Sequence, residues 1–363
     1  MNIVGKITGV KYEIVFSEQL KSIDLKVFDI NTAPSACIVT DNKNSFAISK
    51  WVSPKRTRSY PFERVYNTLN LSKKITVIPI VKDEGAGGDR DYIQWDTVSL
   101  MSLLDVYVIF AYYTKADKAK LKITNQKFDN KYVLSKIKEI EKYHSSALHW
   151  NLEELNTNLH NILNKVKTSY REIEKSTKVK LHNEQGFDNF QIKIGTDVSE
   201  FMAFSRGKAE KAQSREYVTI QPKESLSTLS KAKVTITNYL GGQYFLTVDE
   251  IIINKKLVSL IEGKHSTNSK LPSKGDIKDG LLKLILYSNL SEVTVNEVKM
   301  KSEAVLCLTS SKIVGNISSS SSAIEITNFK KSNSFTNPQI KLIDSLISEA
   351  KKNNVIIKIQ HSK

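Results

Sequence analysis

The sequence predicts a mixed α/β protein with more than one domain. The chain has 363 residues, which is more than a single domain of about 100–200 residues requires. Apolar residues make up 40% and charged residues 25%, a balance typical of globular rather than disordered proteins. Segments with the alternating pattern of strands are interspersed with segments whose apolar residues recur at helical spacing. Together these three observations indicate an α/β (α+β) fold.

Residues 1–127 are expected to form an N-terminal α/β domain. Five apolar or alternating runs predict strands: Ile3–Val10, Tyr12–Phe16, Ala36–Thr40, Ile75–Val81 and Val106–Tyr113. Pro79 favours an edge position for its strand, because proline cannot donate a hydrogen bond to a neighbouring strand. Residues 93–104 carry apolar side chains at helical spacing and predict a helix between two of these strands.

Residues 128–184 are expected to form a helical connector. An apolar stripe runs through this segment, and no proline or glycine occurs between Asp129 and Lys178. We expect two helices with a hinge near residues 144–150, joining the N-terminal domain to a C-terminal domain over residues 185–363.

The C-terminal domain is expected to contain a mixed sheet with helices. The patterns predict strands at Val234–Asn238, Tyr244–Ile253, Leu257–Glu262, Ala304–Thr309 and Val355–Gln360, and helices at Asp276–Leu290 and Ile340–Lys351. Ser273 is the expected N-cap of the first of these helices. The second and third strands are joined by a short polar turn and predict a hairpin.

Two acidic residues and a lysine are expected to converge on this hairpin. Asp249 lies on one strand and Glu262 on the next, so antiparallel pairing can bring the two carboxylates together. Because side chains alternate between the faces of a strand, Glu262 and Lys264 point the same way and Gly263 points the other way. A second interpretation is a solvated hairpin tip whose charges pair across the strands.

Phosphodiester hydrolysis gives such a cluster a chemical purpose. A hard divalent cation stabilises the charge that develops on the phosphate and activates water, and Mg²⁺ commonly takes only one or two protein carboxylates. Asp249 and Glu262 are the candidate Mg²⁺ ligands, with the carbonyl of Gly263 as a third oxygen. Lys264 is the candidate residue to orient or help deprotonate the attacking water.

The series Asp249…Glu262-Gly263-Lys264 resembles the D…(D/E)-x-K signature of the PD-(D/E)XK nuclease superfamily, which includes many type II restriction endonucleases. The order of predicted elements over about residues 195–310, a three-strand meander followed by a helix and a strand, is similar to the core of that superfamily. Val248 stands where the signature often has a proline. The resemblance implies a restriction-endonuclease-like core and a Mg²⁺-dependent endonuclease that cuts double-stranded DNA.

The same resemblance implies a further acidic group from an upstream helix. Glu210 and Glu216 are the candidates, and the sequence does not choose between them. Cutting both strands suggests either a homodimer or two sequential nicks. The recognition sequence, the stagger of the cut and its sensitivity to methylation are not encoded by any motif.

The charge of the chain makes nucleic acid the expected partner. The formal net charge is +16, although the abundance of Lys, Asn, Ile and Ser is also what an AT-rich coding sequence produces. The expected DNA contacts are Lys55, Arg56, Arg58 and Arg64, in one basic loop, and Arg206 and Arg215. For the loop, a solvated linker is the second interpretation, and for the last two arginines an ordinary surface position.

A glycine-rich acidic segment, Asp83–Asp96, has no assigned role. It lacks the Gly-Lys-Ser/Thr end of a phosphate-binding loop and the spacing of an EF-hand. Either a turn held by its own hydrogen bonds or a second metal or active site fits this composition.

Other function classes are disfavoured by what the sequence lacks. No apolar run approaches the length of about 20 residues that a membrane span needs, and the first residues do not resemble a secretion signal, so we expect a cytoplasmic protein without membrane contact. Cys37 and Cys307 are too few for a disulfide framework or a thiolate metal site. The alternatives to a restriction enzyme are a nucleic-acid-binding protein without catalysis, a repair or phage-defence nuclease without strict sequence specificity, and a protein-interaction scaffold.

Overall fold

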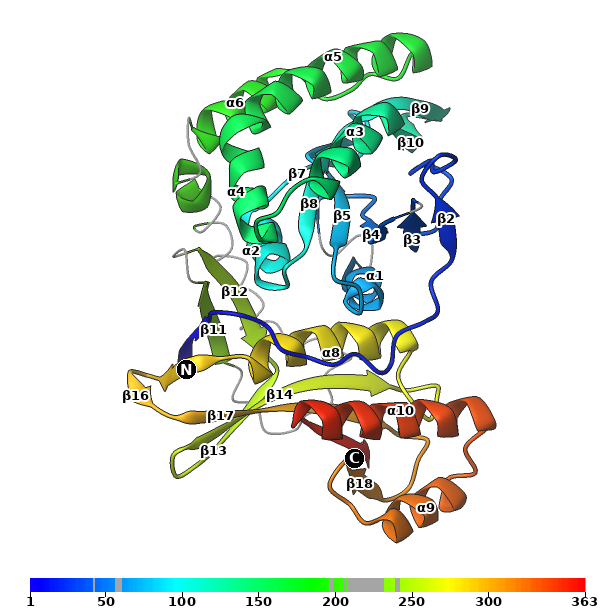
Figure 1. The fold of residues 1–363 in the computed structure, drawn as a ribbon, viewed down its shortest axis with the longest axis vertical. Coiled ribbons are helices and arrows are strands. Elements are labelled where there is room, and N and C mark those ends of the chain that lie inside the picture. The colour runs from blue at the N-terminus through cyan, green and yellow to red at the C-terminus, as the bar shows by residue number, and fades with distance from the viewer. Residues whose placement is uncertain are drawn as a thin grey trace. The chain divides into compact units, whose positions relative to one another are not determined.

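The structure is a computed structural model and describes residues 1–41, 43–55, 61–195, 199–204, 207, 232–238 and 242–362. The molecule is a mixed α/β protein, as the sequence predicts (Figure 1). It divides into two compact units. The front unit is Gln19–Lys208, and the back unit combines Met1–Glu18 with Ala209–Lys363. The start of the chain therefore belongs with its C-terminal part, and the expected helical connector belongs to the front unit.

The front unit contains most of the expected α/β elements. Its strands are β2 (Ser22–Asp24), β3 (Ala36–Thr40), β4 (Ser45–Lys50), β5 (Lys74–Pro79), β6 (Val81–Asp83), β7 (Arg90–Tyr92), β8 (Tyr107–Ala111), β9 (Tyr113–Ala119) and β10 (Lys122–Phe128). Its helices are α1 (Pro61–Thr68), α2 (Trp95–Leu103), α3 (Asn130–Glu141), α4 (Ala147–Thr157), α5 (Leu159–Thr177) and α6 (Gln185–Ile194).

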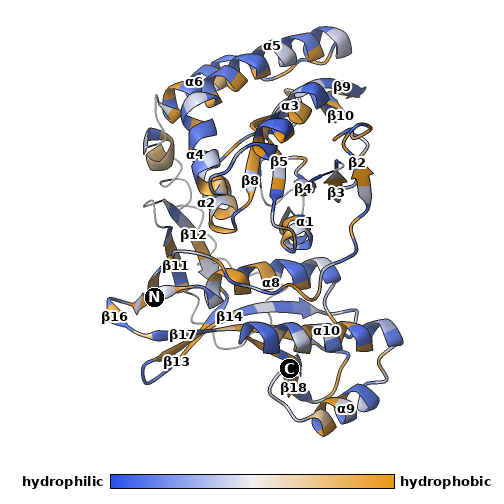
Figure 2. Ribbon diagram, in the orientation of Figure 1, coloured by the Kyte–Doolittle hydropathy of each residue, from blue (hydrophilic) through white to orange (hydrophobic). Residues whose placement is uncertain are grey.

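A five-stranded sheet with the order β2-β3-β4-β5-β8 forms the centre of the front unit. Only the β3–β4 pair is antiparallel. β8 and α2 are entirely buried, and Figure 2 shows their hydrophobic character. Such continuous apolar runs are what a strand covered on both faces requires. Helices α2, α3, α4 and α5 pack against β8, whereas α1 packs against β3 and β4.

The expected edge position of Pro79 is wrong, because β5 lies between β4 and β8. Pro79 is the last residue of β5, and β4 has already ended at Lys50, the partner of Val77. On the other side, the amide of Ile80 donates to the carbonyl of Ala111 at 2.9 Å. The amides of successive residues in a strand point to opposite neighbouring strands. Because the amide of Ile80 faces β8, the nitrogen of Pro79 faces the β4 side, where β4 has already ended and no hydrogen bond is needed.

The helical stretch after Phe128 forms three helices rather than the two expected. Asp129 caps α3 through a hydrogen bond from the amide of Tyr132 to its side chain. The first break, between α3 and α4, lies near the expected hinge. The unexpected break is at Asn158, between α4 and α5, where φ is −118° and the side-chain amide donates to Glu154 and to the hydroxyl of Tyr132. Local side-chain hydrogen bonds of this kind compete with helix continuation, and periodicity alone does not reveal them.

In the part of it that the structure describes, the back unit contains two five-stranded sheets. Its strands are β1 (Asn2–Ile7), β11 (Ala232–Asn238), β12 (Gln243–Val248), β13 (Glu250–Asn254), β14 (Leu257–Ser266), β15 (Ser291–Val295), β16 (Val298–Lys299), β17 (Lys301–Ser310), β18 (Asn316–Ser318) and β19 (Ile356–His361). Its helices are α8 (Lys274–Ser288), α9 (Ala323–Ser332) and α10 (Asn337–Asn353). One sheet has the order β12-β11-β1-β15-β16 and the other the order β13-β14-β17-β19-β18.

One predicted strand, Tyr244–Ile253, is interrupted at Asp249. β12 pairs with β11 in the first sheet, and β13 pairs with β14 in the second. Asp249 is therefore the point at which the chain passes from one sheet to the other. β14 then runs parallel to β17, and α8, which lies between them in the chain, packs against both strands.

The predicted strand Tyr12–Phe16 is not formed. The amides of Val15 and Phe16 instead donate to one carboxylate oxygen of Glu349 on α10, at 3.1 and 2.7 Å. An acidic side chain thus takes the place of a neighbouring strand as the partner of this backbone. Ser273 caps α8 through the amide of Asp276, as predicted. Among the helices that the structure describes, none is both long and apolar enough to cross a membrane.

Candidate active site

The break at Asp249 places its carboxylate opposite Glu262. In the β13–β14 hairpin Glu250 pairs with Ile261, so Asp249 faces Glu262 when the register continues by one residue. The amide of Gly263 donates to Oδ2 of Asp249 at 2.8 Å, which fixes the carboxylate beside β14. The structure thus brings together Asp249, Glu262 and Gly263, as the sequence predicts.

Glu262 and Lys264 lie on one face of β14. Nζ of Lys264 is 2.9 Å from Oε1 of Glu262, and Glu262 is only 1% exposed. Glu262 is also in the middle of a ten-residue strand rather than at its end. The interpretation as a solvated hairpin tip is therefore wrong.

Two charged residues of α8 complete this cluster. Nζ of Lys283 lies 2.7 Å from the same Oε1 of Glu262, and Oδ2 of Asp279 lies 2.5 Å from Nζ of Lys264. Sequence reasoning missed both residues. A signal was present, because an acid and a lysine four positions apart share a helix face, and α8 directly follows the strand that carries Glu262 and Lys264. We define the charge cluster as Asp249, Glu262, Lys264, Asp279 and Lys283.

A glycine allows α8 to approach the strand closely. A Cβ atom built on Gly280 would lie 2.6 Å from a methyl group of Leu306 on β17 and 3.4 Å from Cε of Lys264. The missing side chain therefore leaves room for the aliphatic stem of Lys264 between helix and sheet. This close contact helps to position the ammonium group of Lys264 between Glu262 and Asp279.

Burial and neighbouring charges shift the pKa values in the cluster. Burial raises the pKa of Glu262, the carboxylate of Asp249 raises it further, and the two lysines oppose both effects. Burial alone would lower the pKa values of Lys264 and Lys283, but the nearby carboxylates, Glu262 first, raise both above the usual range of lysine. Both lysines are therefore cations at neutral pH.

The carboxylates fit the way in which proteins hold Mg²⁺. Oε2 of Glu262 is buried and has no hydrogen-bond partner in the described part of the chain, although Oε1 is held by two lysines. A buried carboxylate oxygen without a partner is costly, and a cation is a partner of suitable chemistry. Within the described ranges no set of three or more His, Cys, Asp or Glu is placed to hold a metal ion, so the fit is to the mode with one or two carboxylates.

The expected DNA contacts are only partly described. Lys55 is exposed, and its amide donates to the hydroxyl of Ser53. Arg64 lies on α1 rather than in the expected basic loop. It is half-buried and donates to the carbonyl of Lys50 at 2.7 Å. Arg56, Arg58, Arg206 and Arg215 lie outside the described residues, as do Glu210 and Glu216.

The acidic segment Asp83–Asp96 is held by hydrogen bonds within itself and to residues 182–183. Oδ2 of the fully buried Asp83 accepts from Nε of Arg90 at 2.6 Å, and Oδ1 is bonded to the amide of Gly85 and to Nδ1 of His182. This arrangement favours a structural turn over a second metal site, because the carboxylate of Asp83 already has three partners.

Comparison of the chain with models of known protein families, with curated proteins and with solved structures found no match. Its function is therefore inferred from the chemistry of its own residues.

Proposed function

We propose that the protein is a Mg²⁺-dependent endonuclease that hydrolyses double-stranded DNA at the charge cluster. The observation that supports this most strongly is the pair of carboxylates, Asp249 and Glu262, which face each other across two strands, with Lys264 bonded to the buried Glu262. A buried cluster with an unpartnered carboxylate oxygen is costly to a fold, and clusters of this kind are concentrated at functional sites.

The topology around the cluster supports the same proposal. β13 and β14 are antiparallel, β14 and β17 are parallel, and α8 lies between them in the chain. This is the later part of the order of elements on which the resemblance to the PD-(D/E)XK superfamily was based. The expected first strand of the meander, β11, instead pairs with β12 and β1 in the other sheet. The break at Asp249 turns the acidic side chain toward β14 and Glu262.

The residues of the cluster would have separate roles in hydrolysis. Mg²⁺, when bound, would stabilise the negative charge that develops on the phosphate and lower the pKa of a water molecule. Asp249 and Glu262 would hold the ion, with the carbonyl of Gly263 as a third oxygen. Lys283 keeps Glu262 in position through Oε1, which leaves Oε2 for the ion.

Lys264 would act as a cation rather than as a base. Its raised pKa keeps the ammonium group protonated, so it can donate hydrogen bonds to the phosphate or orient water but does not readily accept a proton. Asp279 holds this ammonium group from the helix side. This assignment narrows the role predicted from the sequence, which included help in deprotonating the water.

The proposed substrate follows from charge and from the resemblance. A formal net charge of +16 favours a polyanion, and a type II restriction enzyme acting on cytoplasmic DNA is the specific form that we propose. Cleavage of both strands would require a homodimer or two successive cuts.

A non-catalytic nucleic-acid-binding protein is the second candidate. It is favoured by the mutual pairing within the cluster, since Lys264 and Lys283 both bond Glu262 and Lys264 also bonds Asp279. Such a network can be purely structural. Binding without catalysis would persist in EDTA and would not depend on Glu262.

Cleavage of long unmethylated phage DNA tests the proposal. The wild type, Glu262→Ala and Glu250→Ala are compared with Mg²⁺ and with EDTA. Glu250 is the matched control, because it lies on the same hairpin but pairs with Ile261 and interacts with Lys358 rather than with the charge cluster. We expect Mg²⁺-dependent cleavage by the wild type and Glu250→Ala, and none by Glu262→Ala.

The pattern of products decides between the forms of the proposal. Discrete bands support a sequence-specific restriction enzyme, whereas a smear supports a nuclease without strict sequence specificity. If the DNA stays intact under all conditions but is retarded on a gel, the protein binds DNA without cutting it, and the nuclease proposal is contradicted.

A further inference from the structure

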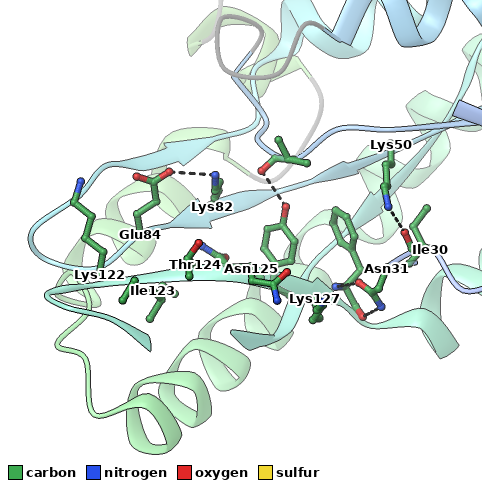
Figure 3. Close-up of a pocket in the computed structure, with 15 residues that line it drawn as sticks. Ile30, Asn31, Lys50, Lys82, Glu84, Lys122, Ile123, Thr124, Asn125 and Lys127 are labelled. Atoms are coloured by element: carbon green, nitrogen blue, oxygen red, sulfur yellow. Dashed lines mark hydrogen bonds and ion pairs between the residues drawn. The ribbon is translucent and has the colours of Figure 1, made fainter. Parts of the chain in front are cut away.

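The front unit contains a cavity that the proposed catalytic cluster does not use. It has a volume of about 540 Å³, which lies within the usual range of ligand sites. It is lined by Ile30, Asn31, Lys50, Val52, Lys82, Glu84, Tyr113, Ala119, Lys122, Ile123, Thr124, Asn125, Gln126, Lys127 and Phe128 (Figure 3). Most of these residues belong to the β9–β10 ribbon, and the others come from β4, β6 and the loops that follow β2, β4 and β6.

The lining of this cavity is strongly basic. Four lysines and one glutamate contribute to it, and Lys82 pairs with Glu84 at 3.1 Å. Lys50, Lys122 and Lys127 form no ion pair with any residue that the structure describes. Figure 3 shows the Lys82–Glu84 contact and the contact of Lys50 with Ile30. The cavity therefore carries more positive than negative side chains among the described residues.

Lys50 is one of the three lysines of the cavity without an ion pair to a described residue. It is half-buried, and its ammonium group donates to the neutral carbonyls of Ile30 and Ala33, at 2.7 and 2.6 Å. Burial lowers the pKa of Lys50, and the positive charges of Arg64 and Lys127 lower it further, against opposing effects of Cys37 and Asp29. An anion in the cavity would offset the repulsion of Lys50 by Arg64 and Lys127.

The remaining walls favour an anion attached to a larger, partly apolar group. Tyr113 and Phe128 are buried and stacked, with ring centroids 4.4 Å apart, and Tyr113 is fixed by a hydrogen bond to the carbonyl of Val52. The pairing of β9 and β10 is irregular around Gln126, whose side chain bonds the carbonyl of Asp83 and the hydroxyl of Tyr170. The cavity therefore combines a rigid aromatic wall with a cationic lining.

We propose that this cavity binds the phosphate group of a nucleotide unit and that DNA supplies it. DNA is favoured as the source because basic character continues outside the cavity, at the exposed Lys115 and Lys118 on the two faces of β9 and at Lys120 in the turn that follows. A run of lysines along a two-stranded ribbon suits the backbone of a continuous polyanion. The inference rests on the proposed function only in taking DNA as the source of the phosphate.

Binding of the full chain to a fluorescein-labelled DNA duplex of about 20 base pairs tests this inference by way of its salt dependence. Fluorescence anisotropy is measured in EDTA, which prevents Mg²⁺-dependent cleavage, at several NaCl concentrations. The test variant is Lys122→Gln/Lys127→Gln, in which neither lysine loses an ion pair with a described residue. The matched control is Lys138→Gln/Lys175→Gln, which removes the same charge from exposed positions near the ends of α3 and α5.

We expect the test variant to bind the duplex at least about tenfold more weakly than the control, with a slope of log K against log[NaCl] that is smaller by about 1.8. Equal affinity and equal slope for the two variants would overturn the inference. Competition with dAMP separates the two sources of phosphate. Lysine-dependent binding of dAMP without lysine-dependent binding of the duplex would support the phosphate site and overturn DNA as its source.

This result is independent of the catalytic proposal. Cleavage by Glu262→Ala at the wild-type rate would contradict the nuclease, yet it would leave the difference between the two lysine variants in EDTA unchanged. Conversely, identical DNA binding by the two lysine variants would contradict the phosphate site in the cavity, and it would leave the expected Mg²⁺-dependent cleavage unaffected.

Discussion

Lys264 is the residue whose surroundings most narrowly limit its role. Its ammonium group lies between Glu262 and Asp279, and its aliphatic stem passes Gly280. We expect Lys264→Met to slow DNA cleavage by about 100-fold or more, because a preorganised cation at a developing charge contributes on this scale. Loss of its hydrogen bonds should also lower the free energy of unfolding by about 2 kcal/mol.

Single-turnover cleavage at saturating Mg²⁺ and urea unfolding measure these two effects. Lys358→Met is the control, because Lys358 lies beside Glu250 and Cys307 and away from the charge cluster. If Lys264→Met cleaves DNA as fast as Lys358→Met, Lys264 has no catalytic role.

Replacement of Asp249 should change how the free energy of unfolding depends on pH. Burial and the charge of Asp249 raise the pKa of Glu262, so the folded chain binds this proton more tightly than the unfolded chain. The free energy of unfolding therefore falls as the pH rises from the usual range of glutamate through the raised pKa. Asp249→Asn removes one cause of the shift and should reduce this fall.

Urea unfolding at about pH 4 and about pH 8 measures the effect, and we expect the stability of Asp249→Asn relative to the wild type to increase by about 1 kcal/mol between them. Glu297→Gln removes an exposed carboxylate from the same unit and serves as the control. A difference between Asp249→Asn and the wild type that is independent of pH would show that the two carboxylates do not interact.

At the scale of elements, β1 links the start of the chain to the back unit. It lies between β11, to which it is parallel, and β15, to which it is antiparallel. Ile3 is fully buried, whereas Val4 is 45% exposed on the other face. We expect Ile3→Ala to lower the free energy of unfolding by about 3 kcal/mol and Val4→Ala by less than about 0.5 kcal/mol, as judged by urea unfolding. Equal effects of the two changes would contradict the placement of β1 inside the sheet.

Several elements could be predicted from local patterns, whereas others, among them β4, β9, β10 and α9, were not expected. β3 and α8 follow their alternating or capped sequences closely. The break between β12 and β13 could not be predicted, because the run from Tyr244 to Ile253 is continuously suited to a strand and only pairing with two different sheets divides it. Between Tyr12 and Phe16, hydrogen bonds to Glu349 replaced strand pairing, and no local pattern encodes a partner near the other end of the chain.

At the scale of the whole molecule, the facing carboxylates were predictable and their surroundings were not. The spacing of Asp249 and Glu262 predicts that they meet across a hairpin, and they do. Asp279 and Lys283 depend on how α8 packs over the sheet, and the division into units depends on the pairing of β1 with β11, which is distant in the sequence. The basic cavity likewise arises from β4, β6 and the β9–β10 ribbon together. These features come from long-range packing, which a single sequence does not specify by its local pattern.

The rate of plasmid cleavage as a function of Mg²⁺ concentration is the most direct test of the proposed active site. The wild type, Asp249→Asn and Glu250→Gln are compared under single-turnover conditions. We expect no cleavage without Mg²⁺, a saturable rise for the wild type and Glu250→Gln, and for Asp249→Asn a rate at least about 100-fold lower that needs more Mg²⁺ to saturate. Cleavage that is independent of Mg²⁺, or an Asp249→Asn variant that matches Glu250→Gln at every Mg²⁺ concentration, would contradict the assignment of Asp249 and Glu262 as the groups that hold the ion.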